Sequence, residues 1–142
     1  MEGKVTLRGG LKFVGQADSG HTVVMDGAHV FGGEDSAPRP SELLLLGLAG
    51  CTGMDVISIL RKKRQPVSGL EITVIGEQEE GHPRAFEGIR VKYTVLGKGV
   101  DPEAVRRSIE LSEEKYCSVG VTLRQGVPIT SEFEILPDEE RA

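Results

Sequence analysis

Two cysteines, Cys51 and Cys117, are the side chains of this sequence whose type best fits a chemical function. A peroxide oxidises a cysteine thiolate to a sulfenic acid, and a second thiol nearby traps that acid as a disulfide. This chemistry requires one reactive thiolate, one resolving thiol and a path for the oxidant. A cysteine inside an apolar segment is, however, often a small buried hydrophobe, so the alternative of two packed and inert thiols stays open.

Other kinds of site lack the sequence motifs that they require. The chain has no C-x-x-C or H-x-x-x-H spacing, and its histidines, His21, His29 and His82, are scattered. We therefore expect no metal and no cofactor. The chain also has no G-x-S-x-G motif of a serine hydrolase and no glycine-rich loop of the phosphate-binding form.

The composition is typical of one cytoplasmic domain that spans residues 1–142. A chain of 142 residues has the length of a single domain. Its net charge of −5 argues against a nucleic-acid partner. The first residues lack the apolar core of a signal peptide, which predicts a cytoplasmic protein. Two cysteines in that compartment are a redox pair or buried thiols rather than a structural disulfide.

The segment Arg39–Arg64, which contains Cys51, is predicted to form one long and almost wholly buried helix. Pro40 fits the first helical position, and Glu42 falls in the first turn, where its charge meets the positive end of the helix dipole. Leucines surround this helix instead of forming one stripe, so it must be covered by protein or lipid. Asp55 disfavours lipid, because an aspartate at the bilayer centre costs about 3 kcal/mol. We expect no membrane partner and cover from a second subunit.

The rest of the chain predicts an α+β fold with antiparallel sheets. Alternating apolar residues between turn signals mark strands at Lys4–Leu7, Leu11–Val14, His21–Met25, Leu70–Glu77, Phe86–Leu96 and Val127–Leu136. An aspartate followed by a proline at residues 101 and 102 predicts the start of a helix that runs to about Lys115. Residues 118–124 fit either a short helix or a strand. Strands in hairpins and helices in separate blocks favour α+β over a doubly wound parallel sheet.

The residues around both cysteines resemble the OsmC/Ohr family, which comprises osmotically inducible protein C and the organic hydroperoxide resistance proteins. The resemblance is carried by PSEL at residues 40–43 leading into Gly50-Cys51, and by EKYCSV at residues 114–119. It covers nearly the whole chain in element order as well as in motif. Two segments, APRPSELLLLGLAGC and EKYCSVGV, are most similar to the YhfA-like branch.

This resemblance implies both an architecture and an activity. The architecture is an intertwined homodimer, in which two long central helices lie against each other and are wrapped by two antiparallel sheets. The activity is that of a thiol-dependent peroxidase that reduces organic hydroperoxides. Cys51 would be the peroxidatic cysteine and Cys117 the resolving cysteine. A dithiol donor, such as a lipoyl protein, would reduce the disulfide.

The sequence departs from the peroxidases of this family at the residues that activate the thiol. Those proteins have an arginine upstream of the proline, whereas the corresponding residues 28–32 of this chain contain none. They also have a glutamate directly after the proline, where this chain has Ser41 and places Glu42 one position later. Arg39 or Arg8 is a candidate for the cation, and Glu42 for positioning. Along the helix, Arg39 lies about 18 Å from Cys51, so a chain fold or a partner subunit must close that gap.

Two further interpretations compete with the peroxidase. The first is a non-catalytic protein that keeps the fold to bind a small apolar ligand or a partner between the subunits, with both cysteines merely buried. The second is a redox sensor that forms the same Cys51–Cys117 disulfide without useful turnover. The missing arginine favours the first alternative, and the pair of cysteines favours the enzyme.

Overall fold

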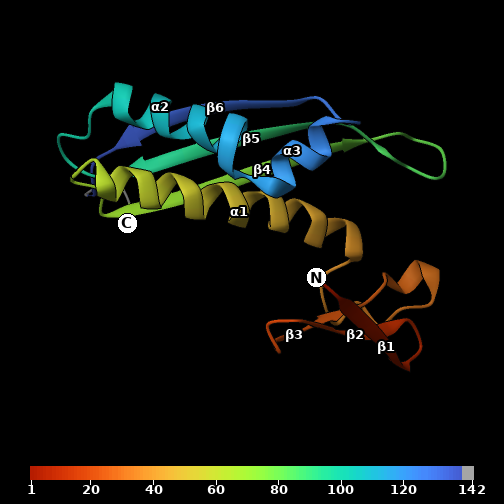
Figure 1. Ribbon diagram of the computed structural model, residues 1–142. Coiled ribbons are helices and arrows are strands. Elements are labelled where there is room, and N and C mark those ends of the chain that lie inside the picture. Colours follow the sequence, from red (N-terminus) through yellow and green to blue (C-terminus); the bar gives the residue numbers. More distant parts are fainter. Residues whose placement is uncertain (139–142) are drawn as a thin grey trace. The chain divides into compact units, whose positions relative to one another are not determined.

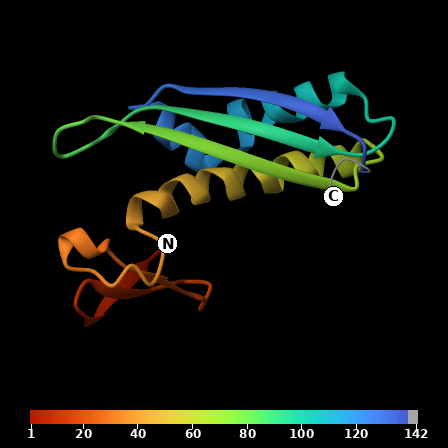
Figure 2. The same cartoon turned by 180° about the vertical axis from the view of Figure 1, so that it is seen from behind.

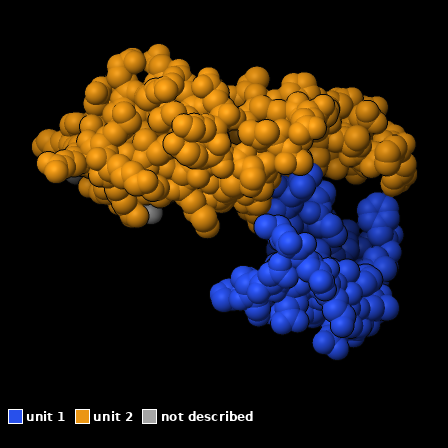
Figure 3. Space-filling view, in the orientation of Figure 1, with its two compact units in different colours: residues 1–44 blue, residues 45–142 orange. Residues whose placement is uncertain are grey.

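The computed structural model describes residues 1–138, which fall into two compact units (Figure 1). The first unit is Met1–Leu44, and the second begins at Leu45 (Figure 3). The boundary falls within the first turns of the long helix α1 (Pro40–Lys62). The expected single domain over residues 1–142 stays a prediction, and its last four residues lie outside the described part of the chain.

The first unit is a small antiparallel sheet followed by a loop. Its strands, in the spatial order β1-β2-β3, are β1 (Gly3–Gly9), β2 (Lys12–Ala17) and β3 (Thr22–Met25). The turn between β1 and β2 uses the positive φ angles of Gly9 and Gly10, which glycine adopts without strain. A short 3-10 helix, η1 (His29–Phe31), follows the sheet. The three strands expected at the start of the chain are therefore confirmed.

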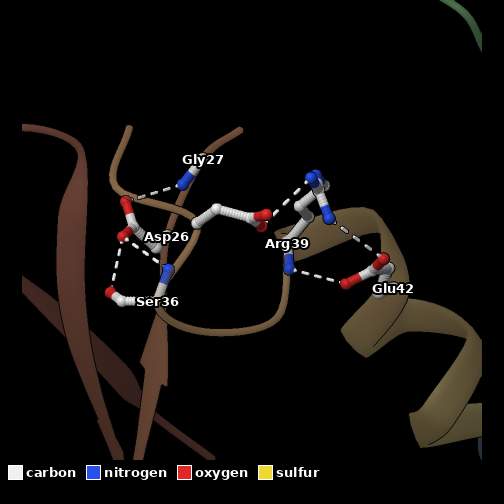
Figure 4. Close-up of polar contacts among 6 residues, drawn as sticks. Asp26, Gly27, Ser36, Arg39 and Glu42 are labelled. Atoms are coloured by element: carbon white, nitrogen blue, oxygen red, sulfur yellow. Dashed lines mark hydrogen bonds and ion pairs between the residues drawn. The ribbon is translucent and has the colours of Figure 1, made fainter. Parts of the chain in front are cut away.

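A buried carboxylate, Asp26, orders the loop after β3. Its side chain is only 2% exposed and accepts hydrogen bonds from the Ser36 hydroxyl at 2.6 Å and from the Gly27 N–H at 2.7 Å (Figure 4). The Ser36 N–H adds a third bond at 3.2 Å. The Ser36 hydroxyl is the main reason that the pKa of Asp26 falls from 3.8 to about 2. Asp26 thus joins both ends of the loop through its charged form.

Ser36→Ala is expected to raise the pKa of Asp26 from about 2 towards its ordinary value of 3.8. A lowered folded-state pKa stabilises the fold above the unfolded value and loses this contribution as the pH falls through the folded value. Acid unfolding of the variant should therefore begin at higher pH. An NMR titration of the Asp26 carboxyl carbon measures the shift, with Ser19→Ala in the exposed β2–β3 turn as control. Identical Asp26 titrations in Ser36→Ala and wild type would contradict this account.

The second unit packs helices on one face of a three-stranded sheet (Figures 1 and 2). After α1, its elements are β4 (Gly69–Gln78), β5 (Phe86–Leu96), α2 (Pro102–Leu111), a π-helix η2 (Ser112–Tyr116), α3 (Ser118–Arg124) and β6 (Ile129–Leu136). Its core joins α1, α2 and β5 through Leu48, Val56, Leu60, Val105, Ile109, Ile89, Val91 and Val95. The helix at residues 118–124 decides the ambiguity that the sequence left open.

The second sheet is mixed, so the expectation of purely antiparallel sheets is wrong for its last strand. β4 and β5 form the predicted antiparallel hairpin, but β6 pairs with β5 in parallel. The reason is the connection between them, which contains α2, η2 and α3. A helical crossover returns the chain to the end of the sheet where β5 began, and the next strand then runs in the same direction.

Helix α1 is less buried than its composition predicts. Within the described chain its buried residues are Leu48, Thr52, Val56 and Leu60, which form one face. Leu46 and Met54, on other faces, are 56% and 74% exposed. One sheet covers only one side of a helix, which leaves the other side for a second subunit to cover. That cover stays a prediction. By length and composition, the helix could also cross a membrane. This is weak evidence, because core helices of soluble proteins meet the same criterion.

Candidate functional site

The structure brings the two cysteines together. Cys51 lies near the middle of α1 and is half-buried, whereas Cys117 lies between η2 and α3 and is 1% exposed. The two sulfur atoms and a carboxylate oxygen of Asp55 all lie within 4.8 Å of one another. Both cysteines are free thiols in this structure. The two thiols are therefore close neighbours in the fold, and one is more accessible than the other.

The wide turn of η2 sets the position of Cys117. The Cys117 N–H donates to the Ser112 carbonyl at 2.8 Å, which closes this π-helical turn. Such turns are rare and frequently occur at functional sites. Cys117 then caps α3, because its sulfur accepts a hydrogen bond from the Gly120 N–H at 3.2 Å. A Cβ at Gly120 would lie only 3.3 Å from that sulfur, so glycine leaves room for the thiol.

The surroundings of Cys117 keep it protonated. Burial raises its pKa from 9.0 to about 11, and the Gly120 N–H opposes part of this rise. Cys51 and the negative charge of Asp55 raise the pKa further. At neutral pH Cys117 is therefore a thiol rather than a thiolate, which suits a resolving cysteine better than an attacking one.

The raised pKa predicts that stability depends on pH through Cys117. A folded-state pKa above the unfolded one stabilises the fold below pH 9, and this contribution is lost as the pH rises towards about 11. Urea unfolding of wild type and Cys117→Ala between these pH values measures the effect, and wild type should lose more unfolding free energy than the variant. Parallel pH profiles of the two proteins would rule out this contribution.

A chain of buried hydroxyl groups leads to Asp55. Ser112 Oγ donates to Asp55 Oδ2 at 3.0 Å, and Thr52 Oγ1 lies 2.8 Å from Ser112 Oγ and 2.7 Å from Tyr93 Oη. Because a hydroxyl carries one proton, Ser112 must accept from Thr52, and Thr52 must accept from Tyr93. Burial raises the pKa of Tyr93 to about 12, so its phenol stays a donor. These hydrogen bonds hold α1 against η2 and β5, next to both thiols.

An ion pair borders the same region. Arg124 Nη2 lies 3.5 Å from Glu113 Oε1, and Arg124 Nη1 donates to the Glu113 carbonyl at 3.4 Å. The Ser131 hydroxyl also donates to Glu113 at 2.5 Å. A narrow cavity with no room for a water molecule is lined by Arg124 and Glu113 together with Cys117 and Tyr93. Arg124 is thus a cation that lines the same cavity as the buried thiol of Cys117.

Arg39 and Glu42 lie at the start of α1 (Figure 4). The Arg39 N–H donates to Glu42 Oε2 at 2.9 Å, which satisfies a backbone donor at the helix end. The Arg39 guanidinium also pairs with Glu42 at 3.4 Å and with Asp35 at 3.2 Å. Both residues belong to the first unit, whereas the two cysteines belong to the second. Their expected part in activating the thiol stays a prediction.

Several site residues were not found by sequence reasoning. Asp55 had a usable signal, since it lies one helical turn after Cys51 and therefore on the same face of α1. Ser112, Tyr93 and Arg124 had none, because they come from three separate elements that only the tertiary fold brings near the cysteines. Spacing along the sequence carries no information about such contacts.

Matches to known proteins cover nearly the whole chain. Residues 33–132 match the family described as OsmC-like protein. Protein YhfA of Escherichia coli strain K12 is 40% identical over 136 residues, which are 96% of this chain and 98% of that protein. The crystal structure of a hypothetical protein from Aquifex aeolicus is 32% identical, with a TM-score of 0.83 over 96% of each chain. These matches confirm the resemblance, including its branch.

More distant structures share the fold. An organic hydroperoxide resistance protein OsmC from Legionella pneumophila is 16% identical, with a TM-score of 0.67 over 94% of this chain and 95% of that chain. At this identity the likeness establishes the α+β fold and nothing about activity. The family match over residues 33–132 and the 40% identity to YhfA together show that this chain belongs to the OsmC-like protein family.

Proposed function

We propose that this protein is a cytoplasmic, homodimeric thiol peroxidase that reduces organic hydroperoxides. The observation that carries the proposal is the meeting of Cys51 and Cys117, whose sulfurs lie within 4.8 Å although the residues are far apart in the sequence. Their unequal burial divides the roles, with the accessible Cys51 meeting the oxidant and the buried Cys117 acting second. The substrate class, organic hydroperoxides, comes from the OsmC/Ohr resemblance of the residues around both cysteines, and membership of the OsmC-like protein family supports it.

The first step oxidises Cys51. Its thiolate attacks one oxygen of the hydroperoxide, a sulfur–oxygen bond forms, and the oxygen–oxygen bond breaks. The products are a Cys51 sulfenic acid and an alkoxide, which takes up a proton and leaves as the alcohol. Two electrons have then passed from the sulfur to the peroxide.

The second step forms the disulfide. Cys117 loses its thiol proton and attacks the Cys51 sulfur, and the hydroxyl of the sulfenic acid leaves as water. The sulfurs lie within 4.8 Å of each other, so they must approach by about 3 Å at most to form a bond of about 2.05 Å. A dithiol donor of the lipoyl type then reduces the disulfide and is itself oxidised to a disulfide, which completes a two-electron cycle.

The activation of Cys51 requires a cation. Arg39, held by Glu42 and Asp35, is our proposed candidate from the first unit, with Glu42 as its positioning residue and Arg8 as an alternative. Arg124 is a candidate from the second unit, because it lines the same narrow cavity as Cys117. Each candidate is testable by replacement with methionine, which keeps length and removes charge.

A second candidate function is supported by a cavity in the first unit. A cavity of about 380 Å³ there is lined almost entirely by apolar side chains, among them Val5, Leu11, Phe13 and Met25. This volume and lining are typical of sites for small apolar ligands. A non-catalytic protein that binds such a ligand is therefore the alternative.

Steady-state reduction of an organic hydroperoxide by a dithiol donor distinguishes these functions. The proposed peroxidase predicts many turnovers for each protein chain. A single oxidation to the disulfide without turnover would instead indicate a redox sensor. If both thiols survive excess hydroperoxide, the protein is neither a peroxidase nor a redox sensor. The ligand-binding protein is then the remaining alternative.

A further inference from the structure

We propose that Cys51, Asp55 and Cys117 bind one Zn²⁺ ion when both cysteines are reduced. The three donor atoms come from α1 and from the residue just before α3, and they all lie within 4.8 Å of one another. The expectation of no metal rested on missing sequence motifs, and the fold assembles this set from residues without such a motif. The inference goes beyond the proposed peroxidase and does not depend on it.

The spacing of the donor atoms is close to that of a zinc site. Zinc–sulfur bonds of about 2.3 Å in a tetrahedron place two sulfurs about 3.8 Å apart. The separations here reach at most 4.8 Å. The two sulfurs must therefore approach each other by about 1 Å at most, and each sulfur must approach the carboxylate oxygen by about 1.3 Å at most, since a sulfur and an oxygen on one zinc lie about 3.5 Å apart. Cys51 and Asp55 lie one turn apart on the same face of α1 and are only partly buried, which leaves their side chains room to rotate.

The chemistry of the donors selects zinc. Two thiolates with one carboxylate suit Zn²⁺, whereas Mg²⁺ and Ca²⁺ prefer oxygen donors alone. Cu⁺ prefers thiolates and would not use the carboxylate of Asp55. On binding, the two thiols release two protons to solvent and the cation takes their place. Three protein ligands leave a fourth position for a water molecule.

The neighbours of the donor atoms already hold two of them in place. Ser112 Oγ donates to Asp55 Oδ2, and the Gly120 N–H donates to the Cys117 sulfur. Hydrogen bonds of this kind orient metal ligands and strengthen binding. The other side of the site is open within the described chain, since a Cβ added at Gly47, one turn before Cys51, would meet no atom within 4 Å.

Zinc binding and disulfide formation exclude each other, because both use the same two sulfurs. Oxidation of the zinc form by a hydroperoxide consumes two protons, forms the sulfur–sulfur bond, and releases the alcohol, water and the free ion. The site would thus hold zinc only while the protein is reduced. This consequence requires the thiols to react with hydroperoxide, whereas zinc binding itself does not.

Titration of the reduced, metal-free protein with Co²⁺ and Zn²⁺ tests the site. Co²⁺ should give a thiolate-to-cobalt charge-transfer absorption that Zn²⁺ abolishes, at one ion for each chain. Cys51→Ser and Cys117→Ser should each weaken Zn²⁺ binding at least about tenfold and reduce this absorption. Asp55→Asn should weaken binding at least about tenfold but keep the absorption. Glu103→Gln, at an exposed carboxylate on α2, is the matched control and should bind as wild type does.

The disulfide form of wild type is a second control that needs no substitution, and it should not bind the ion. The absence of the charge-transfer absorption in reduced wild type would overturn the proposal. Equal affinity of Asp55→Asn and wild type would also overturn it, because the carboxylate would then not be a ligand. No peroxide is present in these titrations. A zinc-binding protein that is inert to hydroperoxide would therefore refute the peroxidase alone.

Discussion

Cys51→Ser is expected to lose the reduction of organic hydroperoxides by at least about a thousandfold, because the variant has no nucleophile for the peroxide oxygen. Cys117, the other thiol, is 1% exposed and its pKa is raised to about 11, so it cannot replace Cys51 as the attacking thiolate. Turnover with a dithiol donor measures the loss. Intact mass after addition of hydroperoxide should remain unchanged in this variant.

Cys117→Ser is the matched control, since it removes the other sulfur with the same substitution. This variant should still be oxidised, but its sulfenic acid has no partner and adds one oxygen atom to the mass instead of removing two hydrogens. A dimedone adduct on Cys51 would identify that acid. If Cys51→Ser formed the sulfenic acid and Cys117→Ser did not, the two roles would be reversed.

Thr52→Val is expected to lower the free energy of unfolding by about 1–3 kcal/mol, although the two side chains have the same shape. The threonine is 3% exposed and connects Tyr93 to Ser112 through hydrogen bonds of 2.7 and 2.8 Å. Valine would leave the Tyr93 hydroxyl without its acceptor inside the core. Urea unfolding measures the change.

The control for this substitution is Thr73→Val, at an exposed position of β4. It should change the unfolding free energy by no more than about 0.5 kcal/mol. Equal stability of Thr52→Val and Thr73→Val would show that the hydroxyl chain does not stabilise the fold. A stable Thr52→Val protein would also remove the reason to expect that this chain fixes the position of the neighbouring Cys51.

Much of the local structure could be predicted from the sequence. Pro40 at the first position of α1 and the alternation in β4 and β5 predicted these elements, which the structure confirms. The start of α2 follows the same pattern, since Asp101 accepts a hydrogen bond from the Glu103 N–H at 3.0 Å. These features depend on residues close together in the chain, where propensity and capping act.

The arrangement of these elements could be predicted only in part. Alternation in β6 indicates a strand but not the direction in which it pairs, which the helical crossover decides. The leucines of α1 predicted cover on all sides, whereas the chain itself covers the face of Leu48 and Val56. In the site, the type of residue identified both cysteines. Their proximity was implied by the family resemblance, and the contacts of Asp55 and Ser112 required the fold.

One measurement tests the central claim most directly: the thiols and the intact mass of the reduced protein after one equivalent of an organic hydroperoxide. The account predicts rapid loss of both thiols and a mass lower by two hydrogens, as a Cys51–Cys117 disulfide requires. Survival of both thiols in excess hydroperoxide would contradict the account, because sulfurs held within 4.8 Å of each other would then be packed and inert.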